Sequence, residues 1–428
     1  MTLRTKFSLI LLSATLAFYA GFGAWISTRA QQPANDPNAQ LRIFDNVLQH
    51  IQNDYVDEPN MEKVRAGALR GLAYGLDPYS TYLTADQVKE FNDDTRKNDV
   101  GIGAELSQVA SYLYVIAPLK GSPADVAGVR AGDIIEYIDG KATRDISLYD
   151  AKQLLNGAPG TDVKLRVLRA NSRPLTVNVK RGSVRAPVAE ARMEPGKIGV
   201  VKINSLADGE AADVRARVQD LTKQGAQKLV LDLRDTASGT LNEGIAVANL
   251  FIKDGVIAQT IGRENKTLKT FSADPKLFVF GGPVVGIINN GTAGAAEIVA
   301  SAIMERNRGQ VVGEKSFGAG AEQQLFTLRD GDGLLLTVVK WASATAKPFL
   351  GEDRSHSGIT PSVEVKTPDV ADSVSPDDLS NDDDNKPAQA PQDKRVPVPE
   401  VKPVEDVQMK KALDLLRENK PAAVPRAA

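Results

Sequence analysis

The chain has 428 residues, of which 42% are hydrophobic and 25% are charged, and its formal net charge is −2. This length suggests two or three domains, and the composition is ordinary for a globular protein with a buried core. A nearly neutral chain without basic tracts is a poor ligand for nucleic acid, so we expect no nucleic-acid partner. The absence of cysteine excludes disulfides, thiolate metal sites and a cysteine nucleophile.

The N-terminal segment is typical of an export signal. Arg4 and Lys6 precede a largely apolar run at residues 7–26, which is long enough to span a hydrocarbon core of about 30 Å. Positive charge before the run favours a cytoplasmic N-terminus. We expect residues 1–30 to be an uncleaved signal anchor, with a cleaved signal peptide as the alternative. Either signal exports the rest of the chain to the periplasm or cell envelope, and the anchor would hold it in the inner membrane.

Residues 41–97 have the apolar spacing of helices. The segments "LRIFDNVLQHIQNDYV", "MEKVRAGALRGLAYGL" and "TADQVKEFNDDTRK" predict three helices, with Thr84 as the N-cap of the third. His50 falls in the first helix, where we expect it to be a surface residue.

Residues 98–182 predict short strands around one helix, "SLYDAKQLLNGA". The stretch "SPADVAGVRAGDIIEYIDG" resembles PDZ domains in both wording and element order. The resemblance implies a groove beside "VGIGAEL", in which a peptide adds as an extra strand and its carboxylate meets backbone N–H groups. A PDZ-like fold with a closed groove is the alternative. The expected peptide-binding residues are Val100, Gly101, Ile102 and Gly103.

Residues 187–365 alternate apolar strands with amphipathic helices. This alternation predicts a largely parallel sheet with helices on both faces, and "LLLTVVKWAS" is expected as a late strand. Ligands of such sheets bind beyond the carboxyl ends of the strands. Two loops follow such strands, "RDTASG" and "NNGTAG". The fold class expected overall is mixed α/β, with a helical N-terminal region, an inserted PDZ domain and an α/β peptidase-like core.

The C-terminal region changes composition. Residues 366–403 are rich in proline and aspartate, which predicts a disordered linker. Within this linker "SNDDDN" lacks the ligand spacing of a calcium loop, so we expect neither a metal nor a cofactor. Residues 404–420 predict an amphipathic helix that docks on the body of the protein or on a partner.

The exported chain resembles the carboxyl-terminal processing proteases, which are serine peptidases of the S41 type with an embedded PDZ domain. The resemblance covers roughly residues 41–420 and rests on "NDYVDE", "LDPYSTYL", "LVLDLRD", "AAEIVASAI", "GITPSVEV" and the PDZ wording. It implies a serine nucleophile with a lysine general base, and dimerising elements at both ends. The implied partners are flexible protein C-termini and a second subunit, in a homodimer or in a mixed oligomer with an active homologue.

Both reactive positions of the family are substituted in this sequence. The family's nucleophile loop reads like N-x-G-S-A-S-A-S-E-I, and alignment on Glu297 puts Gly294 at the serine. The lysine of F-G-K-G-x-x-Q corresponds to Ala319 in "FGAGAEQ", whereas the orienting glutamine is kept as Gln323. Glycine has no nucleophile and alanine accepts no proton.

The oxyanion side of this site is partly kept. The family's L-R-x-N-P-G-G loop appears as "LRDTASG", which retains Gly239 but loses the Asn-Pro and one glycine. The expected oxyanion donors are the backbone N–H groups of Gly239 and Ala295. Other side chains could in principle replace the lost groups, and the candidates are Thr292, Ser301, Lys315 and His356.

Three readings of the function follow. The favoured one is an exported pseudoprotease that binds C-terminal tails without cutting them. The second is an active serine-type endopeptidase that uses another nucleophile or a partner's active site. The third is a structural envelope protein with a closed groove.

Overall fold

The structure is a computed structural model that describes residues 37–93, 100–144, 146–170, 172–185, 187–367 and 405–418. The expected anchor at residues 7–26 and nearly all of the expected linker at 366–403 lie outside these residues. Among the residues described, no helix is long and apolar enough to cross a membrane. The chain divides into two compact units, Met1–Ala68 and Leu69–Ala428.

The first unit contains helix α2 (Pro37–Asp54) and the first half of α3 (Met61–Tyr74). Helix α2 leaves its large apolar side chains exposed, namely Leu41, Ile43, Phe44, Val47 and Leu48. His50 is also exposed, and its Nδ1 lies 2.6 Å from Asp54 Oδ2 one turn later. The prediction of a surface histidine is therefore confirmed.

The second unit begins with the end of α3, strand β1 (Thr81–Leu83) and helix α4 (Ala85–Asn92). Thr84 caps α4 as predicted, because its hydroxyl accepts the Gln87 N–H and the Gln87 side chain accepts the Thr84 N–H. The sequence analysis missed β1, which pairs antiparallel with β18 (Gly333–Ser343). Its three buried residues are too few to show an alternating pattern.

The PDZ-like part is a sheet with strand order β3-β4-β5-β7-β8, and β3 is at its edge. Its helices are α5 (Pro123–Val126) and α6 (Leu148–Leu155), and the short strand β2 (Val100–Gly101) pairs with β9 (Gly182–Ser183). Leu106, Leu155 and Leu165 belong to its own buried core. The strands are β3 (Ala104–Val109), β4 (Tyr112–Pro118), β5 (Ile134–Ile138), β6 (Lys141–Ala142), β7 (Asp162–Leu168) and β8 (Leu175–Lys180).

The core domain contains the predicted parallel sheet, in the order β10-β11-β12-β15-β16-β19. Only the first pair, β10 with β11, is antiparallel, and the other four pairs are parallel. The strands are β10 (Glu190–Glu194), β11 (Ile198–Lys202), β12 (Lys228–Asp232), β15 (Val284–Ile288), β16 (Gly309–Gly313) and β19 (Val363–Glu364).

Helices cover both faces of this sheet. Leu229 and Leu231 of β12 point into the cluster formed with α7 (Glu210–Lys223), α8 (Leu241–Asn249) and α9 (Ala295–Glu305). Val230 between them points to the opposite face. Because a strand buried on both faces needs apolar residues at successive positions, Leu229, Val230 and Leu231 form a continuous apolar run rather than an alternating one.

A second sheet is entirely antiparallel, which corrects the placement of "LLLTVVKWAS" among the strands of the parallel sheet. That segment is β18, and it pairs with β1, β13 (Val256–Ile261) and β17 (Ala321–Thr327), while β13 also pairs with β14 (Thr267–Ser272). The 3-10 turns η2 (Arg263–Asn265) and η3 (Arg329–Gly331) connect β13 to β14 and β17 to β18. Such short connections allow antiparallel neighbours only.

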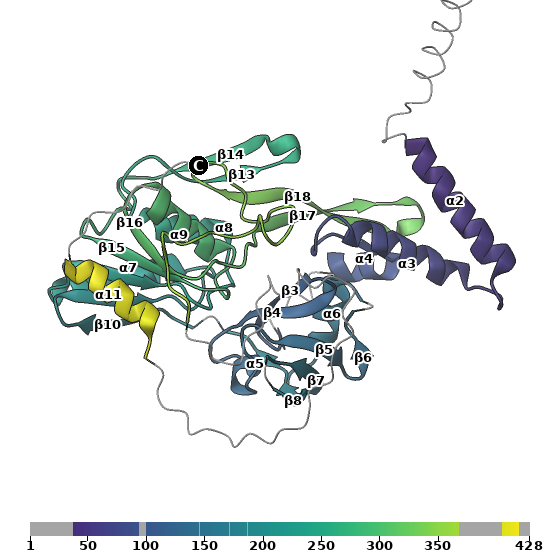
Figure 1. The fold of residues 1–428 in the computed structure, drawn as a ribbon, viewed down its shortest axis with the longest axis horizontal. Coiled ribbons are helices and arrows are strands. Elements are labelled where there is room, and N and C mark those ends of the chain that lie inside the picture. The colour runs from purple at the N-terminus through teal and green to yellow at the C-terminus, as the bar shows by residue number, and fades with distance from the viewer. Residues whose placement is uncertain are drawn as a thin grey trace, which may run out of the picture. The chain divides into compact units, whose positions relative to one another are not determined.

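The C-terminal helix α11 (Val407–Glu418) docks on the body of the protein, and it lies beside the parallel sheet in Figure 1. Its buried side chains Met409, Ala412, Leu413 and Leu416 pack against the face that includes Val230. Arg234 anchors the start of the helix, because its Nη1 and Nη2 each donate to an Asp406 oxygen at 2.9 Å. Of the two docking modes expected for this helix, the structure shows the first.

This docking predicts a measurable loss on truncation of an apolar contact. Leu413→Ala removes a side chain that is 8% exposed, and we expect the free energy of unfolding to fall by about 2 kcal/mol. Urea unfolding of the full-length chain in mild detergent measures this change. Lys411→Ala, on the exposed side of α11, is the control. A Leu413→Ala variant as stable as that control would show that α11 contributes no packing energy.

Candidate active site

The turn between β15 and α9 holds its central glycine in an unusual conformation. Gly294 has φ 58° and ψ −113°, and it is the N-cap of α9. This backbone conformation is strained for any residue with a Cβ. Sharp strand-to-helix turns of this kind present the nucleophile in other α/β hydrolases. The turn between β15 and α9, called the elbow turn below, therefore has this strand-to-helix form, with glycine at its N-cap.

The space around Gly294 is open enough for a side chain. A Cβ built there would lie 3.6 Å from Trp341 Cζ3 and 4.0 Å from the Ala237 carbonyl oxygen. Both distances are ordinary contacts, so sterics alone do not demand glycine at this position. Glycine itself supplies no side-chain nucleophile at this position.

One buried carboxylate joins the two degenerate positions. Oε2 of Glu297 accepts the N–H of Gly294 at 2.7 Å and the N–H of Ala319 at 2.9 Å. The position aligned to the serine and the position aligned to the lysine therefore meet at a single oxygen atom. Distant segments of the sequence are brought together at the place where the family alignment expects a dyad.

The other oxygen of the same carboxylate is equally occupied. Oε1 of Glu297 accepts the Ser316 hydroxyl and the N–H of Gly318 at 2.9 Å. Ser316 in turn accepts the N–H of Ile359 at 2.7 Å. Sequence reasoning used Glu297 only as an alignment landmark and did not identify Ser316. The sequence signal that could have predicted these contacts is Glu297 itself, because an acidic residue in the first turn of an apolar helix needs hydrogen-bond partners.

The environment of Glu297 shifts the pKa of its carboxyl group. Its side chain is fully buried, and burial raises the pKa of the carboxyl to about 7. The hydrogen bonds from Ser316, Ala319 and Gly294 and the field of Arg354 lower the pKa and offset part of that rise.

The two expected oxyanion donors lie at the starts of two helices, since Gly239 directly precedes the N-cap of α8 and Ala295 begins α9. Gly239 has φ 150° and packs against Leu206, since a Cβ at Gly239 would lie 2.5 Å from Leu206 Cβ. It is the Ala237 carbonyl that faces Gly294. Ala295 is buried at the first position of α9, directly after Gly294.

The retained glutamine lies on an exposed strand. Gln323 belongs to β17, and its Nε2 is 3.5 Å from Thr337 Oγ1 at the limit of a hydrogen bond. With alanine at position 319 the glutamine has no amine to orient.

The alternative hydroxyls are committed to backbone carbonyls. Thr292 is fully buried, and its Oγ1 donates to the Leu233 carbonyl at 2.9 Å while it accepts the Asn289 N–H at 3.0 Å. Ser301 is also buried, and its Oγ donates to the Ile298 carbonyl at 3.2 Å. Neither hydroxyl has a general base as its acceptor, which nucleophilic activation requires.

The alternative bases are likewise occupied elsewhere. Lys315 Nζ donates to the carbonyls of Arg354 and Ser355 at 3.2 Å and 3.1 Å. His356 is exposed, and its Nδ1 lies 2.8 Å from Asp353 Oδ1. Among the described residues, no group of histidine, aspartate and glutamate could hold a metal ion.

The outer face of the PDZ sheet packs against the degenerate site. Tyr114 of β4 stacks on Phe317 with ring centroids 5.8 Å apart. The same apolar cluster contains Ala293 from the elbow turn, and Ala237 and Ala319 border it. A charged amine at position 319 would therefore meet apolar neighbours.

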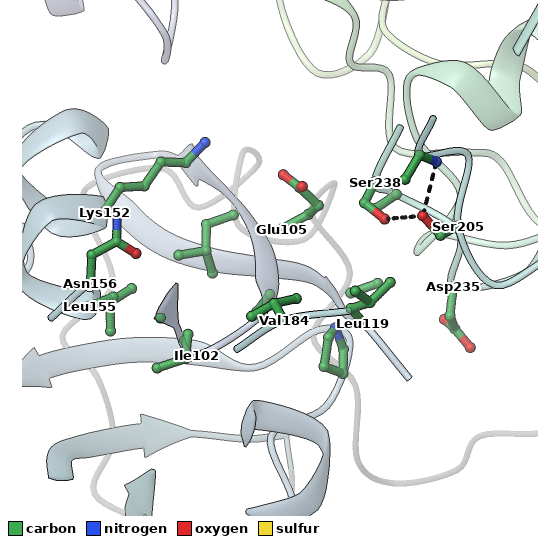
Figure 2. Close-up of a pocket in the computed structure, with 18 of the residues that line it drawn as sticks. Ile102, Glu105, Leu119, Lys152, Leu155, Asn156, Val184, Ser205, Asp235 and Ser238 are labelled. Carbon is green, nitrogen blue, oxygen red and sulfur yellow. Dashed lines mark hydrogen bonds between the residues drawn. The ribbon is translucent and has the colours of Figure 1, made fainter. Parts of the chain in front are cut away.

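A cavity of about 610 Å³ runs along the free edge of β3 and α6 and reaches the core loop at Ser205 and Ser238. Figure 2 shows Lys152 and Leu155 on the helix side of this cavity and Ser205 and Ser238 at the other end. The expected peptide-binding residues Val100, Gly101, Ile102 and Gly103 all line it.

Glycine is required in the loop of this groove. Gly103 has φ 70°, and a Cβ there would lie 2.5 Å from Ser122 Cβ. The loop can therefore bring its backbone close to a ligand only without a side chain. Together, the groove and its edge strand could accept an extended peptide.

The raised pKa of Glu297 predicts how the free energy of unfolding depends on pH. Because its folded pKa lies above its ordinary value of 4.5, the stability that Glu297 contributes is greatest below about pH 4.5 and is lost as the pH rises to 7. Urea unfolding should therefore show that the wild type loses about 2 to 3 kcal/mol more than Glu297→Gln between pH 5 and pH 8.

Glu297→Gln should also be less stable than the wild type at pH 5, by about 2–4 kcal/mol, because its amide NH₂ faces donors. At pH 8 this difference should be smaller by the 2 to 3 kcal/mol that only the wild type loses. Glu264→Gln on the surface is the control, since Glu264 is 87% exposed. Parallel pH profiles for wild type and Glu297→Gln would contradict the assignment.

Comparison with known proteins agrees with this architecture. Residues 197–365 match the model of peptidase family S41, and residues 114–169 match a PDZ domain model. The carboxy-terminal processing protease CtpA of Bacillus subtilis (strain 168) is 31% identical over 346 residues, which cover 81% of this chain and 73% of that protein. The "Probable CtpA-like serine protease" of Staphylococcus aureus (strain MRSA252) is 33% identical, over 77% of this chain and 66% of that protein.

A solved structure shows the same fold. The photosystem II D1 C-terminal processing protease is 26% identical with a TM-score of 0.62, over 76% of this chain and 86% of that chain. The position 294 turn, the PDZ-like insert and the curated relatives all lead to one assignment: the chain belongs to the S41 family of carboxy-terminal processing proteases.

Proposed function

We propose that this protein is a pseudoprotease that binds C-terminal tails of other proteins through its PDZ groove without cleaving them. The observation that carries the proposal is the pair of positions joined by Glu297, where Gly294 and Ala319 offer neither a nucleophile nor a base. In a comparable hydrolase, loss of the nucleophile alone lowers turnover by about 10⁶. Oxyanion donors and binding alone retain about 10³–10⁴ over water, which is too little for a useful peptidase.

The binding half of the proposal is supported by the groove. Strand β3 is at the edge of its sheet, and α6 faces it across a cavity lined by the glycine loop. An extended peptide can complete the hydrogen bonds of such an edge, and its carboxylate can accept the loop N–H groups. Apolar side chains at the floor, including Ile102 and Leu106, suit an apolar final residue.

The cellular setting belongs to the same proposal. The apolar segment at residues 7–26 holds the protein in the inner membrane, and the remaining chain faces the periplasm or cell envelope. The exposed apolar side chains of α2 are available for a second subunit, in a homodimer or in a mixed oligomer with an active homologue.

An active serine-type endopeptidase is the alternative function, favoured by the names of the relatives. It requires a hydroxyl and a base other than the aligned pair. The commitments of Thr292 and Ser301 to backbone carbonyls count against these two hydroxyls.

A degradation assay separates the two functions. The full-length chain in mild detergent is incubated with an unfolded protein, beside Gly294→Ser, Ala319→Lys and the double variant. We expect cleavage by the double variant only. The apolar neighbours of position 319 lower the pKa of an introduced amine, as a general base requires.

The control for this assay is His356→Ala, which alters an exposed residue outside the cleft and should behave as the wild type does. Cleavage by the wild type, abolished by Thr292→Val or Ser301→Ala, would establish the alternative function and reject the pseudoprotease.

Peptide binding tests the groove directly. A labelled peptide with an apolar C-terminal residue should bind the full-length chain, and amidation of its carboxylate should weaken binding at least roughly tenfold, because charge-assisted hydrogen bonds are lost. Fluorescence anisotropy measures both affinities.

Gly103→Ala should weaken the same binding, whereas Gly121→Ala should not. The two glycines have similar φ values of 70° and 76°, but a Cβ at Gly121 meets nothing within 4 Å. Both substitutions therefore strain the backbone in the same way, but only Gly103→Ala also clashes with Ser122. Binding that ignores the carboxylate would indicate a closed or structural groove instead.

A further inference from the structure

Two opposite charges flank the groove without being paired to each other. Lys152 of α6 is exposed and Glu105 of β3 is half-buried, and both line the cavity. In the part of the chain that the structure describes, neither side chain has a hydrogen-bond or ion-pair partner. The third charged residue of the lining, Asp235, already accepts a hydrogen bond from the Asn289 side chain at 2.9 Å.

Lys152 and Glu105 lie toward different faces of strand β3. Leu106 is buried in the PDZ core, and Gln108 on the same face donates to the Ile146 carbonyl at 2.8 Å. The register of β3 with β4 shifts between Glu105 and Leu106, but Ala104 on the other side of Glu105 also packs against the PDZ core. Because successive side chains of a strand point to opposite faces, Glu105 points to the other face, as Val109 does. Val109 packs in the cluster with Phe317 of the core domain. Strand alternation thus places Glu105 on the face of β3 opposite the PDZ core. Lys152 extends from α6 itself (Figure 2).

The spacing on α6 sets which ligand residue Lys152 meets. Leu155 and Ile102 belong to the same buried cluster and line the end of the groove beside the glycine loop. Lys152 precedes Leu155 by three residues, which is about 4.5 Å along a helix axis. Two residues of an added strand span about 6.6 Å, and a long lysine side chain bridges the difference. Lys152 thus reaches the side chain two positions before the final one.

We propose that this groove selects tails with an acidic residue two positions before an apolar C-terminal residue and a basic residue immediately before it. The inference rests on the proposed function, since it assumes a tail added as a strand to β3 with its carboxylate at Gly101–Gly103. The acidic side chain faces α6 and pairs with Lys152. The basic side chain faces the opposite side and pairs with Glu105 across the two strands.

The reverse tail meets repulsion at both positions. A basic residue would then face Lys152 and an acidic residue would face Glu105. Each exposed pair of opposite charges changes affinity only roughly twofold to fivefold. Reversing two such pairs changes attraction to repulsion twice, so the expected difference in affinity is about tenfold.

The test uses four labelled peptides with a common upstream sequence and the full-length chain in mild detergent. Their endings are Glu-Lys-Leu, Lys-Glu-Leu, Ala-Ala-Leu and Glu-Lys-Leu amide. Anisotropy titrations should rank Glu-Lys-Leu above Ala-Ala-Leu and Ala-Ala-Leu above Lys-Glu-Leu. The spread between the first and the last should be about tenfold at 50 mM salt and should shrink at 500 mM salt.

Charge-reversal variants assign the preference to its residues. Lys152→Glu should favour a basic residue at the position two before the end, and Glu105→Lys should favour an acidic residue at the next position. The double reversal should bind Lys-Glu-Leu better than Glu-Lys-Leu. Lys141→Glu, on the exposed strand β6 outside the groove lining, is the matched control and should leave the ranking unchanged. Circular dichroism and thermal unfolding show whether each variant is folded.

The outcomes are distinguishable. If Glu-Lys-Leu and Lys-Glu-Leu bind within twofold of each other while amidation still weakens binding, the charge preference is wrong and the tail-binding function stands. If no peptide binds, or the amide binds equally well, both the tail-binding function and this inference are rejected. A preference that survives Lys152→Glu and Glu105→Lys would assign the selectivity to other residues and overturn the inference.

Discussion

The carboxylate of Glu297 organises the centre of this molecule. It accepts hydrogen bonds from Gly294, Ser316, Gly318 and Ala319, and so fastens the elbow turn to the segment that leads into β17. A buried carboxylate with this many donors is costly to leave unpaired, so it fixes both segments once the core forms. The scaffold of a catalytic centre is therefore retained independently of the reactive groups that such a centre would carry.

The surroundings of positions 294 and 319 suit the small residues that this chain has there. Ala319 borders an apolar cluster that includes Ala293, Tyr114 and Phe317, so the outer face of the PDZ sheet packs against the segments that carry positions 294 and 319. A buried lysine amine at 319 would have been desolvated there. The alanine removes that cost, and glycine at 294 removes the strain of a Cβ in the elbow. Glycine at 294 and alanine at 319 are thus both compatible with a stable fold.

The sequence predicts those parts of the fold that depend on a short stretch of neighbouring residues. Patterns of a few residues predict the Thr84 cap, the helices of the core and the apolar run Leu229–Leu231 of β12. The antiparallel sheet and β1 could not be predicted in the same way, because pairing of Thr81–Leu83 with Gly333–Leu335 joins segments far apart in the chain.

The candidate site shows the same limit. Alignment placed Gly294 and Ala319, but the single oxygen that joins them and the Ser316 contribution depend on tertiary packing. Gly239, expected as an oxyanion donor, packs against Leu206, and this contact between distant segments could not be predicted from the loop sequence. Local motifs thus located the positions, and only the three-dimensional structure showed their contacts.

The central claim is that the cleft contains no activated hydroxyl, and covalent labelling measures this directly. The full-length chain is treated with a fluorophosphonate that reacts with activated serine and threonine hydroxyls, and its intact mass is then determined. The account predicts an unmodified mass for the wild type and one adduct for the Gly294→Ser/Ala319→Lys variant. A stoichiometric adduct on the wild type, mapped to Thr292, Ser301 or another residue of the cleft, would contradict it.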